Sequence, residues 1–310
     1  MTGERIRKSD KTLPLVRASV AGPVVAALRK VNIEPAFVLD PLGLNEAQLM
    51  DRQNFVPHDT VYQVFQAVAD ATSPAFCAKV GKSVDLVRFL PLGDTLADAL
   101  TLGDFFTKFT QAVSKESNAV TQTLLVEDEH AYLNARRNFV VSVSPAQADA
   151  FLASVWISLL HRVLDFRWDP HQIILQVCDP DTLPEQFHGV KAIQCGPQGF
   201  SIRFPSNWLS YRLTQEVLEN PSDLRIKDSD LAAPLDFLAG LEGLIRVHLA
   251  EPEFGVDALA DLCGFHRETL NNRLKPYGLT ASQVIARLKQ DAAESLLIEG
   301  NTSVAETARR

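Results

Sequence analysis

The sequence has only 4 cysteines and 2 methionines among its 310 residues. The cysteines (Cys77, Cys178, Cys195 and Cys263) form no C-x-x-C pair, so neither a disulfide framework nor a zinc site is expected. No apolar run approaches the ~20 residues of a membrane-spanning helix. The polar N-terminus also lacks the apolar core of a secretion signal. We therefore expect a cytoplasmic protein with reduced thiols, no metal ion and no membrane partner.

Motifs of the common enzyme classes are also missing. The sequence contains no G-x-S-x-G elbow, no phosphate-binding loop and no G-x-G-x-x-G that follows a strand. Its 7 histidines are dispersed. His161 lies in an apolar helical segment, where a histidine is more often a core residue than a general base. We expect neither enzymatic activity nor a cofactor.

Net positive charge is the third thing the chain lacks, since its formal charge is −8. From Asp230 onward there are eight Lys and Arg against twelve Asp and Glu. Between His266 and Lys289, however, there are five basic residues and a single acidic one, Glu268. Phosphate binding depends on such a local patch rather than on the total charge. The length of the chain allows two domains, each with its own core.

The N-terminal two thirds of the chain show a mixed pattern, which predicts an α+β domain that is mostly helical with a small antiparallel sheet. Helical periodicity predicts helices at residues 19–31, 57–71, 74–80 and 145–166, and a helical pair at 92–100 and 105–113 around Gly103 and Asp104. Alternation predicts a β-hairpin from 119–127 and 131–141 with an acidic turn, and strands at 171–177 and 199–204.

Residues 256–275 predict two helices joined by a tight turn. Ala258, Leu259 and Leu262 follow helical spacing, and Gly264 then interrupts it where a left-handed backbone is expected. Leu270 and Leu274 give the second segment one apolar stripe. This order is typical of a helix-turn-helix, whose second helix enters the DNA major groove.

This C-terminal stretch resembles the DNA-binding unit of the AraC/XylS family of bacterial transcription regulators, in which one long helix joins two helix-turn-helix motifs. The matching positions in the first motif are Leu259, Ala260, Gly264, Leu270, Leu274 and Lys275. Those in the connecting helix are Leu288, Ala292, Leu296 and Leu297, and residues 303–308 (SVAETA) match the opening of the second motif. His266, Glu268 and Asn272 depart from the family pattern of Ser, Arg and Arg.

The sequence stops at Arg310, before a second turn and recognition helix. We interpret it as a partial sequence, because residues 305–310 begin a helix with nothing to pack on. A natural form with a single motif is the alternative.

The resemblance implies an effector-binding and dimerisation domain at 14–212, a linker at 213–233 and an all-α DNA-binding domain at 234–310. It implies double-stranded DNA and a small-molecule effector as partners, with a homodimer and contact to RNA polymerase as further expectations for an activator. The alternative function is a ligand-binding or dimerisation protein that has lost DNA binding together with the second motif.

Candidate effector residues come from the aromatic and charged positions of the first domain. Phe105 and Phe109 lie on one helical stripe, and Trp156, on a different predicted helix, is a further apolar candidate. Core packing is the alternative interpretation of such aromatic residues. Arg136 and Arg137 could pair with an anionic effector, although only one of two consecutive strand residues faces inward. The candidate set is Phe105, Phe109, Arg136, Trp156 and His161.

Candidate DNA contacts lie on the second helix of the motif, opposite its leucines. Asn271 and Asn272 have the amide chemistry that reads adenine, and Arg267 can read guanine. Glu268 repels phosphate but can accept a hydrogen bond from cytosine. Lys275 and Arg273 are expected at phosphates. The full set is His266, Arg267, Glu268, Asn271, Asn272, Arg273 and Lys275.

Overall fold

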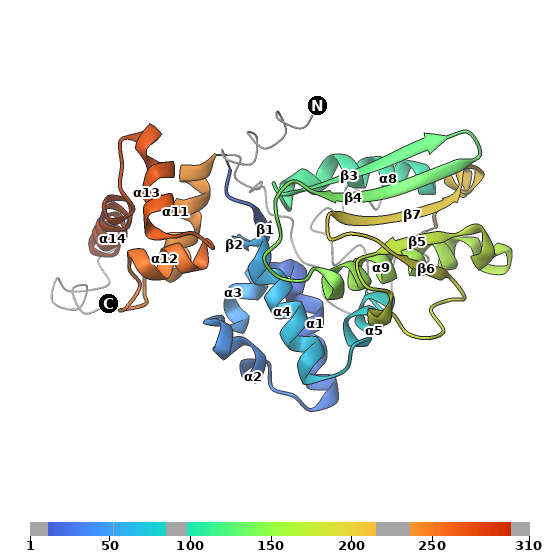
Figure 1. Cartoon of the computed structure of the whole chain (residues 1–310), viewed down its shortest axis with the longest axis horizontal. Helices are drawn as coiled ribbons and strands as arrows, with labels where there is room; N and C mark the ends of the chain where they lie inside the picture. Colours follow the sequence, from blue (N-terminus) through green and yellow to red (C-terminus); the bar gives the residue numbers. More distant parts are fainter. Residues whose placement is uncertain (1–11, 52, 85–97, 215–235, 299–310) are drawn as a thin grey trace.

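The computed structural model describes residues 12–51, 53–84, 98–214 and 236–298, and these build two separate hydrophobic cores (Figure 1). The larger core belongs to an N-terminal α+β part and the smaller one to an all-helical C-terminal part. This agrees with the predicted class of each part. The predicted linker at 213–233 and the second-motif match at 303–308 lie outside the described residues, apart from the linker's first two positions.

Five short helices open the N-terminal part. They are α1 (Gly22–Leu28), α2 (Pro35–Leu39), α3 (Glu46–Met50), α4 (His58–Ala71) and α5 (Phe76–Lys82). Short 3-10 turns extend α1 at both ends and follow α2. Asn45 starts α3 with a capping box, since its side chain accepts from the Gln48 N–H while Gln48 accepts from the Asn45 N–H. The helices predicted at 19–31, 57–71 and 74–80 are therefore present with shifted ends.

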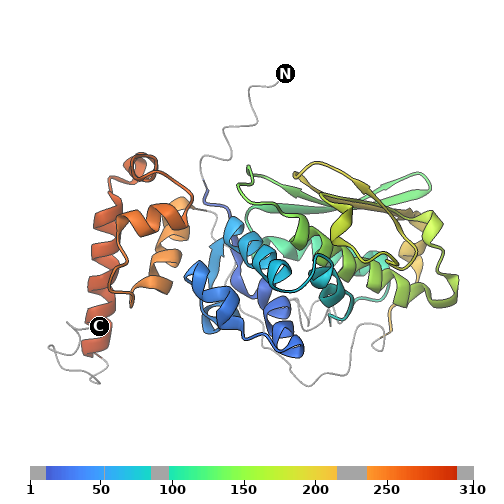
Figure 2. The ribbon, with the colours of Figure 1, turned by 60° about the horizontal axis from the view of Figure 1, so that its bottom comes forward.

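One five-stranded sheet forms the upper layer of this part (Figure 2). Its strands, in spatial order, are β3 (Val120–Glu127), β4 (His130–Arg137), β7 (Gly199–Pro205), β5 (Ile174–Val177) and β6 (Lys191–Gln194). The β3–β4 hairpin confirms the prediction. The expected small, purely antiparallel sheet is wrong in extent, because β6 adds a strand parallel to β5. That edge strand is mostly exposed, so it carries no alternating apolar signal.

Helices α8 (Leu102–Ala112) and α9 (Ala146–Leu164) pack beneath the sheet (Figure 2). Fifteen of the nineteen α9 residues are buried, as is typical of a helix enclosed on all sides. The predicted break at Gly103 and Asp104 is wrong. Thr101 caps α8 at Asp104, and Gly103 lies inside the helix, where an added Cβ would come within 3.1 Å of the Leu209 carbonyl oxygen. Most of the predicted partner helix at 92–100 lies outside the described residues.

Close packing between α5 and α9 depends on Gly81. A Cβ at this position would lie 2.3 Å from the backbone oxygen of Phe151. We expect Gly81→Ala to lower the free energy of unfolding by about 1–3 kcal/mol, because two backbones must separate. The matched control is Gly243→Ala in an exposed helical position with no atom within 4 Å. It should raise stability by up to ~1 kcal/mol. Urea unfolding of both variants measures the difference, and equal effects would contradict the packing argument.

The described residues of the C-terminal part form four α-helices. They are α11 (Phe237–His248), α12 (Val256–Leu262), α13 (Arg267–Leu274) and α14 (Ala281–Ile298). Gly264, between α12 and α13, has the predicted left-handed conformation with φ of 67°. Leu259, Leu270 and Leu274 are buried, whereas Ala258 is exposed and does not belong to the apolar side predicted for it.

A two-stranded ladder lies between the two cores (Figure 1). It pairs β1 (Leu15–Arg17) with β2 (Phe55–Pro57), and Val16 lies opposite Val56. These two valines belong to the N-terminal core, while Leu15 and Phe55 belong to the core of the C-terminal helices. Because side chains alternate along a strand, one short ladder contributes to both cores.

Candidate functional site

The N-terminal core contains a cavity of about 100 Å³ between the sheet and helices α4, α8 and α9. Apolar side chains dominate its wall, among them Val61, Phe65, Phe109, Leu152 and Phe200. A single buried water needs roughly 10–15 Å³ of such space. The cavity is therefore large enough for a small organic molecule.

Four buried side chains on the cavity wall carry polar atoms without a hydrogen-bond partner in the described part of the chain. These atoms are both ring nitrogens of His58, Oε1 of Gln122, Oδ2 of Asp149 and Nε1 of Trp156. Each residue is more than nine-tenths buried. Unpaired buried polar groups cost about 1–3 kcal/mol each, so their gathering around one space is characteristic of a binding site.

A buried ion pair forms the polar end of the cavity. Arg137 donates from Nη2 to Asp149 Oδ1 and from Nε to the Tyr62 hydroxyl at 2.7 Å. A third bond runs from Nη1 to the Pro197 carbonyl at 2.9 Å. Burial raises the pKa of Asp149 to about 6, against the opposing effect of the Arg137 charge. Each nitrogen of the guanidinium thus donates one hydrogen bond, whereas Asp149 Oδ2 has no partner among the described residues.

A second ion pair also lines the cavity. Arg17 of β1 donates from Nε to Glu116 Oε2 at 2.8 Å, and its guanidinium stacks 4.7 Å from the centre of the Phe55 ring. Phe55 in turn packs in the core of the C-terminal helices. Arg17 therefore touches both the cavity and the ladder that joins the two cores.

His58, the first residue of α4, borders two spaces at once. It lines the cavity, and it also lines a cleft of about 350 Å³ between the two parts of the chain. Phe254, Ala258 and Gly264 form part of the other wall of that cleft. Burial, aided by the charge of Arg137, lowers the pKa of His58 to about 3, so its ring is neutral.

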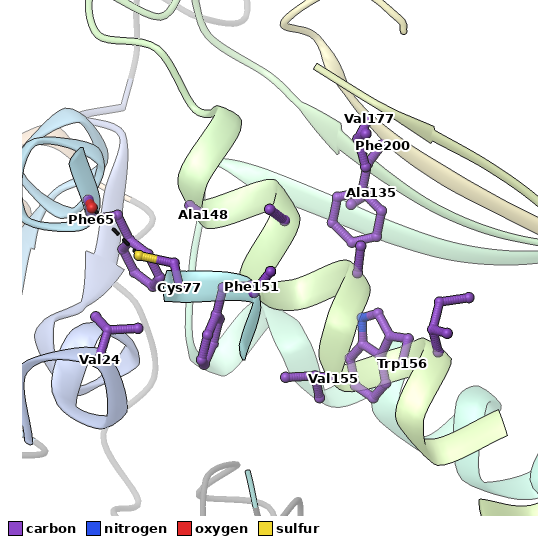
Figure 3. Packing of buried hydrophobic residues seen from close by; sticks show 14 of the residues in the cluster. Val24, Phe65, Cys77, Ala135, Ala148, Phe151, Val155, Trp156, Val177 and Phe200 are labelled. Atoms are coloured by element: carbon purple, nitrogen blue, oxygen red, sulfur yellow. Dashed lines mark hydrogen bonds between the residues drawn. The ribbon is translucent and has the colours of Figure 1, made fainter. Parts of the chain in front are cut away.

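The structure brings some of the sequence-predicted effector residues together and separates others. Phe109 and Trp156 line the cavity, with ring centres 4.5 Å apart. Figure 3 shows Trp156 on α9 below Ala135 and Phe200 of the sheet. Phe105 packs behind Trp156 with its ring centre 6.3 Å away.

Arg136 and His161 lie away from the cavity. Arg136 is exposed, and its neighbour Arg137 is the inward-facing member of the pair. His161 contacts Trp168 edge-on and lies tilted against His188, near the other end of α9. The phase of the strand contained a signal for the choice between the arginines, because Ala131, Leu133 and Ala135 alternate in step with position 137.

The predicted DNA-contacting residues lie on α13 or at its ends, but only some are fully exposed. His266, Arg267, Glu268, Asn272 and Lys275 are exposed, and Arg267 Nη1 lies 3.4 Å from Asp257 Oδ1. Thr269, which is not among the predicted contacts, is also exposed. Leu270 and Leu274 are fully buried and fix which side faces outward.

Asn271 and Arg273 have structural contacts. The Asn271 side-chain oxygen accepts from the N–H of Ala281 at 3.0 Å and so anchors the start of α14. The guanidinium of Arg273 stacks 4.3 Å from the centre of the Phe265 ring. Both residues are half-buried. Arg287 pairs with Glu242, so carboxylates neutralise part of the local basic patch.

The described residues contain no group of three or more His, Cys, Asp or Glu side chains arranged to hold a metal ion. None of the described helices combines the length and apolar character required to cross a membrane.

Comparison with known proteins gives one family match. Residues 33–213 match the model of the arabinose-binding domain of AraC transcription regulators, an N-terminal domain. No curated protein sequence matches the chain. The crystal structure of the transcriptional regulator CdpR from Pseudomonas aeruginosa is similar at 14% sequence identity and a TM-score of 0.44, and the alignment covers 93% of this chain and 88% of that chain. The matched segment includes every residue of the cavity wall except those from β1 and the turn after it.

Proposed function

Since the chain belongs to the AraC family of transcription regulators that carry the N-terminal arabinose-binding domain, we propose that it binds double-stranded DNA sequence-specifically through α13 and senses a small-molecule effector in the cavity. The observation that carries the DNA-binding half is the exposed polar row of α13 above buried Leu270 and Leu274. A turn at left-handed Gly264 connects this helix to α12, as in units that place their second helix in the major groove.

The proposed organisation assigns 14–212 to effector binding and dimerisation, 213–233 to a linker and 234–310 to DNA binding. The protein acts in the cytoplasm as a homodimer without enzymatic activity, and contact with RNA polymerase makes it an activator. Gel-shift titration of the protein against duplexes selected from a random-sequence pool tests DNA binding. Affinity that is equal for selected and scrambled duplexes, or that is insensitive to salt, would contradict it.

The reading face of α13 consists of Arg267, Glu268, Thr269 and Asn272, and His266 precedes its first residue. An amide can form two hydrogen bonds with adenine, and a carboxylate can accept from the cytosine amino group. A threonine methyl group can contact thymine. Lys275 extends the row at the end of the helix, where its charge meets a phosphate. Asn271 and Arg273 leave this face because their side chains hold the domain together.

Asn272→Ala is expected to change operator preference, and the neighbouring Asn271→Ala provides a matched comparison. Loss of a bidentate contact weakens binding to the preferred duplex by about 1–3 kcal/mol and leaves stability nearly unchanged. Asn271→Ala should instead lower the free energy of unfolding by about 0.5–2 kcal/mol, because the α14 N–H loses its acceptor. Gel shifts with single-base operator variants and urea unfolding separate the two effects.

Lys275→Ala serves as the control for those measurements. Removing a phosphate contact weakens binding to all duplexes alike and lowers the magnitude of the salt slope by about 1. If Asn272→Ala behaves in this uniform way, Asn272 does not read a base.

The route from the cavity to the DNA-binding helices is the β1–β2 ladder. Arg17 contacts both the cavity and Phe55, and Phe55 packs in the core that contains Leu241, Leu259 and Leu270. A ligand that moves the Arg17 side chain therefore also moves Phe55, against which the C-terminal helices pack. Such a shift requires the ligand to bind the two arrangements with different affinities.

Phe55→Ala is expected to uncouple the two parts. The Phe55 ring is 94% buried between the two parts. Its removal lowers the cooperativity with which they unfold, so calorimetry should show two transitions where wild type shows one. Phe37→Ala is the control, because that ring is 74% exposed. A wild-type protein that already unfolds in two independent transitions would contradict coupling through this ladder.

A further inference from the structure

We infer that the cavity takes an uncharged molecule with an apolar middle and a hydroxyl, phenol or amide group at each end. This inference rests on the proposed effector-sensing function and adds the chemical class of the effector. The evidence for this class is the set of polar atoms without hydrogen-bond partners on an otherwise apolar cavity wall.

Electrostatics exclude a charged ligand. The wall contains two cations and two anions, and they are already paired as Arg17 with Glu116 and Arg137 with Asp149. A ligand carboxylate would meet the unpartnered Oδ2 of Asp149. A ligand ammonium bound to that oxygen would leave the cavity with one uncompensated positive charge, because Arg137 already neutralises the carboxylate. A buried charge without a dedicated partner is strongly unfavourable, whereas a neutral ligand leaves both pairs intact.

The spacing of the unpartnered atoms defines the shape of the ligand. Asp149, Leu152 and Trp156 all line the cavity from one side of α9. Seven helical residues span about 10 Å, so the carboxylate oxygen and the indole N–H mark two ends with Leu152 between them. At one end of the cavity Asp149 Oδ2 accepts a hydrogen bond from the ligand. At the other end Trp156 Nε1 donates one to the ligand.

The remaining polar atoms fit the same ligand. The neutral ring of His58 offers one donor and one acceptor beside the ion pair. Gln122 lies opposite Ala135, which is two residues from Arg137 on the same strand. The backbone of Gln122 therefore lies opposite a point about 7 Å along β4 from Arg137. Its Oε1 is a second acceptor without a partner. A hydroxyl, phenol or amide can both donate and accept, as these positions require.

A free sugar does not fit this wall. A pentose presents hydroxyl groups along its whole length, and several of them would face Val61, Phe65, Phe109 and Leu152. A hydroxyl buried against such side chains loses its hydrogen bonds to water without replacement. An aromatic or short aliphatic middle instead buries apolar surface there.

The test compares isosteric compounds by calorimetric titration of the full chain. Tyrosol has a hydroxyl at each end of a phenyl ring and no charge, tyramine is its cationic counterpart, and para-hydroxyphenylacetate is its anionic counterpart. We expect tyrosol to bind at least about tenfold more tightly than either charged isostere and than L-arabinose. Trp156→Phe should weaken tyrosol at least about tenfold, because the N–H donor is lost together with the pyrrole part of the indole.

Gln122→Met is the second variant, for the case in which Trp156→Phe does not fold. It keeps the side-chain length, removes the acceptor and should also weaken tyrosol. Equal or tighter binding of tyramine, para-hydroxyphenylacetate or L-arabinose overturns the assignment, as does absence of binding by all four. Effector sensing has a separate readout, the operator affinity with and without bound tyrosol. If tyrosol binds as expected but leaves operator affinity unchanged, the ligand class holds and the sensing function fails.

Discussion

Arg137→Met is expected to lower the free energy of unfolding by about 3–5 kcal/mol. The arginine is 6% exposed and makes three hydrogen bonds, one of them to the buried carboxylate of Asp149. Its removal leaves that carboxylate uncompensated between the sheet and α9. Methionine keeps much of the side-chain volume, so the loss reflects charge and hydrogen bonds rather than a cavity.

The adjacent residue provides the control, because Arg136 is exposed on the other face of the same strand. Arg136→Met should change stability by less than about 0.5 kcal/mol. The double variant Arg137→Met/Asp149→Leu should recover most of the loss, since a buried ion pair can be replaced by apolar side chains at little net change. Urea unfolding of wild type, Arg137→Met, Asp149→Leu and the double variant gives the cycle. A double variant as unstable as Arg137→Met alone would show that the pair is not the cause.

These two arginines also show how far the sequence could locate the cavity. Alternation predicts that only one of them faces inward. Our candidate set names Arg136, and this choice is wrong, because Arg137 is the buried member in phase with Ala131, Leu133 and Ala135. The partners of Arg137 are not predictable in this way, because Tyr62 and Asp149 lie 75 and 12 residues away on two helices. The alternation of residues along a strand thus identifies an inward-facing charge. Its hydrogen-bond partners become apparent only from the packing of α4 and α9 on the sheet.

The same distinction applies to the helix proposed to read DNA. The leucine stripe correctly predicts the buried side of α13. It cannot predict that Asn271 supplies the acceptor for the first N–H of α14, because that contact depends on the turn at Gly278. The ladder between the two cores gave no sequence signal at all, since β1 and β2 have three residues each and pair across about forty positions. Three residues are too few to establish a period.

The largest pH effect is expected from His58, whose pKa falls from 6.5 to about 3 in the folded chain. Burial is the main cause, and the charge of Arg137 adds to it. Because the folded state disfavours the protonated ring, His58 leaves stability unaffected above pH 6.5. Stability then falls as pH drops from 6.5 towards 3, by about 1.4 kcal/mol per pH unit, and the loss approaches about 5 kcal/mol.

The difference between wild type and a variant isolates this contribution. Asp149 has a raised pKa, so it acts with the opposite sign between pH 3.8 and about 6, but it is present in both proteins. His58→Phe and His58→Gln both remove the titrating group, one with an apolar and one with a polar side chain. We expect wild type to lose about 2 kcal/mol more than either variant between pH 6.5 and 5, measured by urea unfolding at each pH.

If both variants keep the wild-type slope, protonation of His58 does not control acid stability. If they flatten it, the result bears on coupling between the two parts, because the same ring borders the cavity and the cleft against the C-terminal helices. Protonation would then place a charge beside Arg137 at the point where the parts meet. Acid should accordingly weaken the contact between the two parts at Phe55 before it unfolds the sheet. Calorimetry of wild type at pH 5 would then show the C-terminal helices unfolding in a separate first transition.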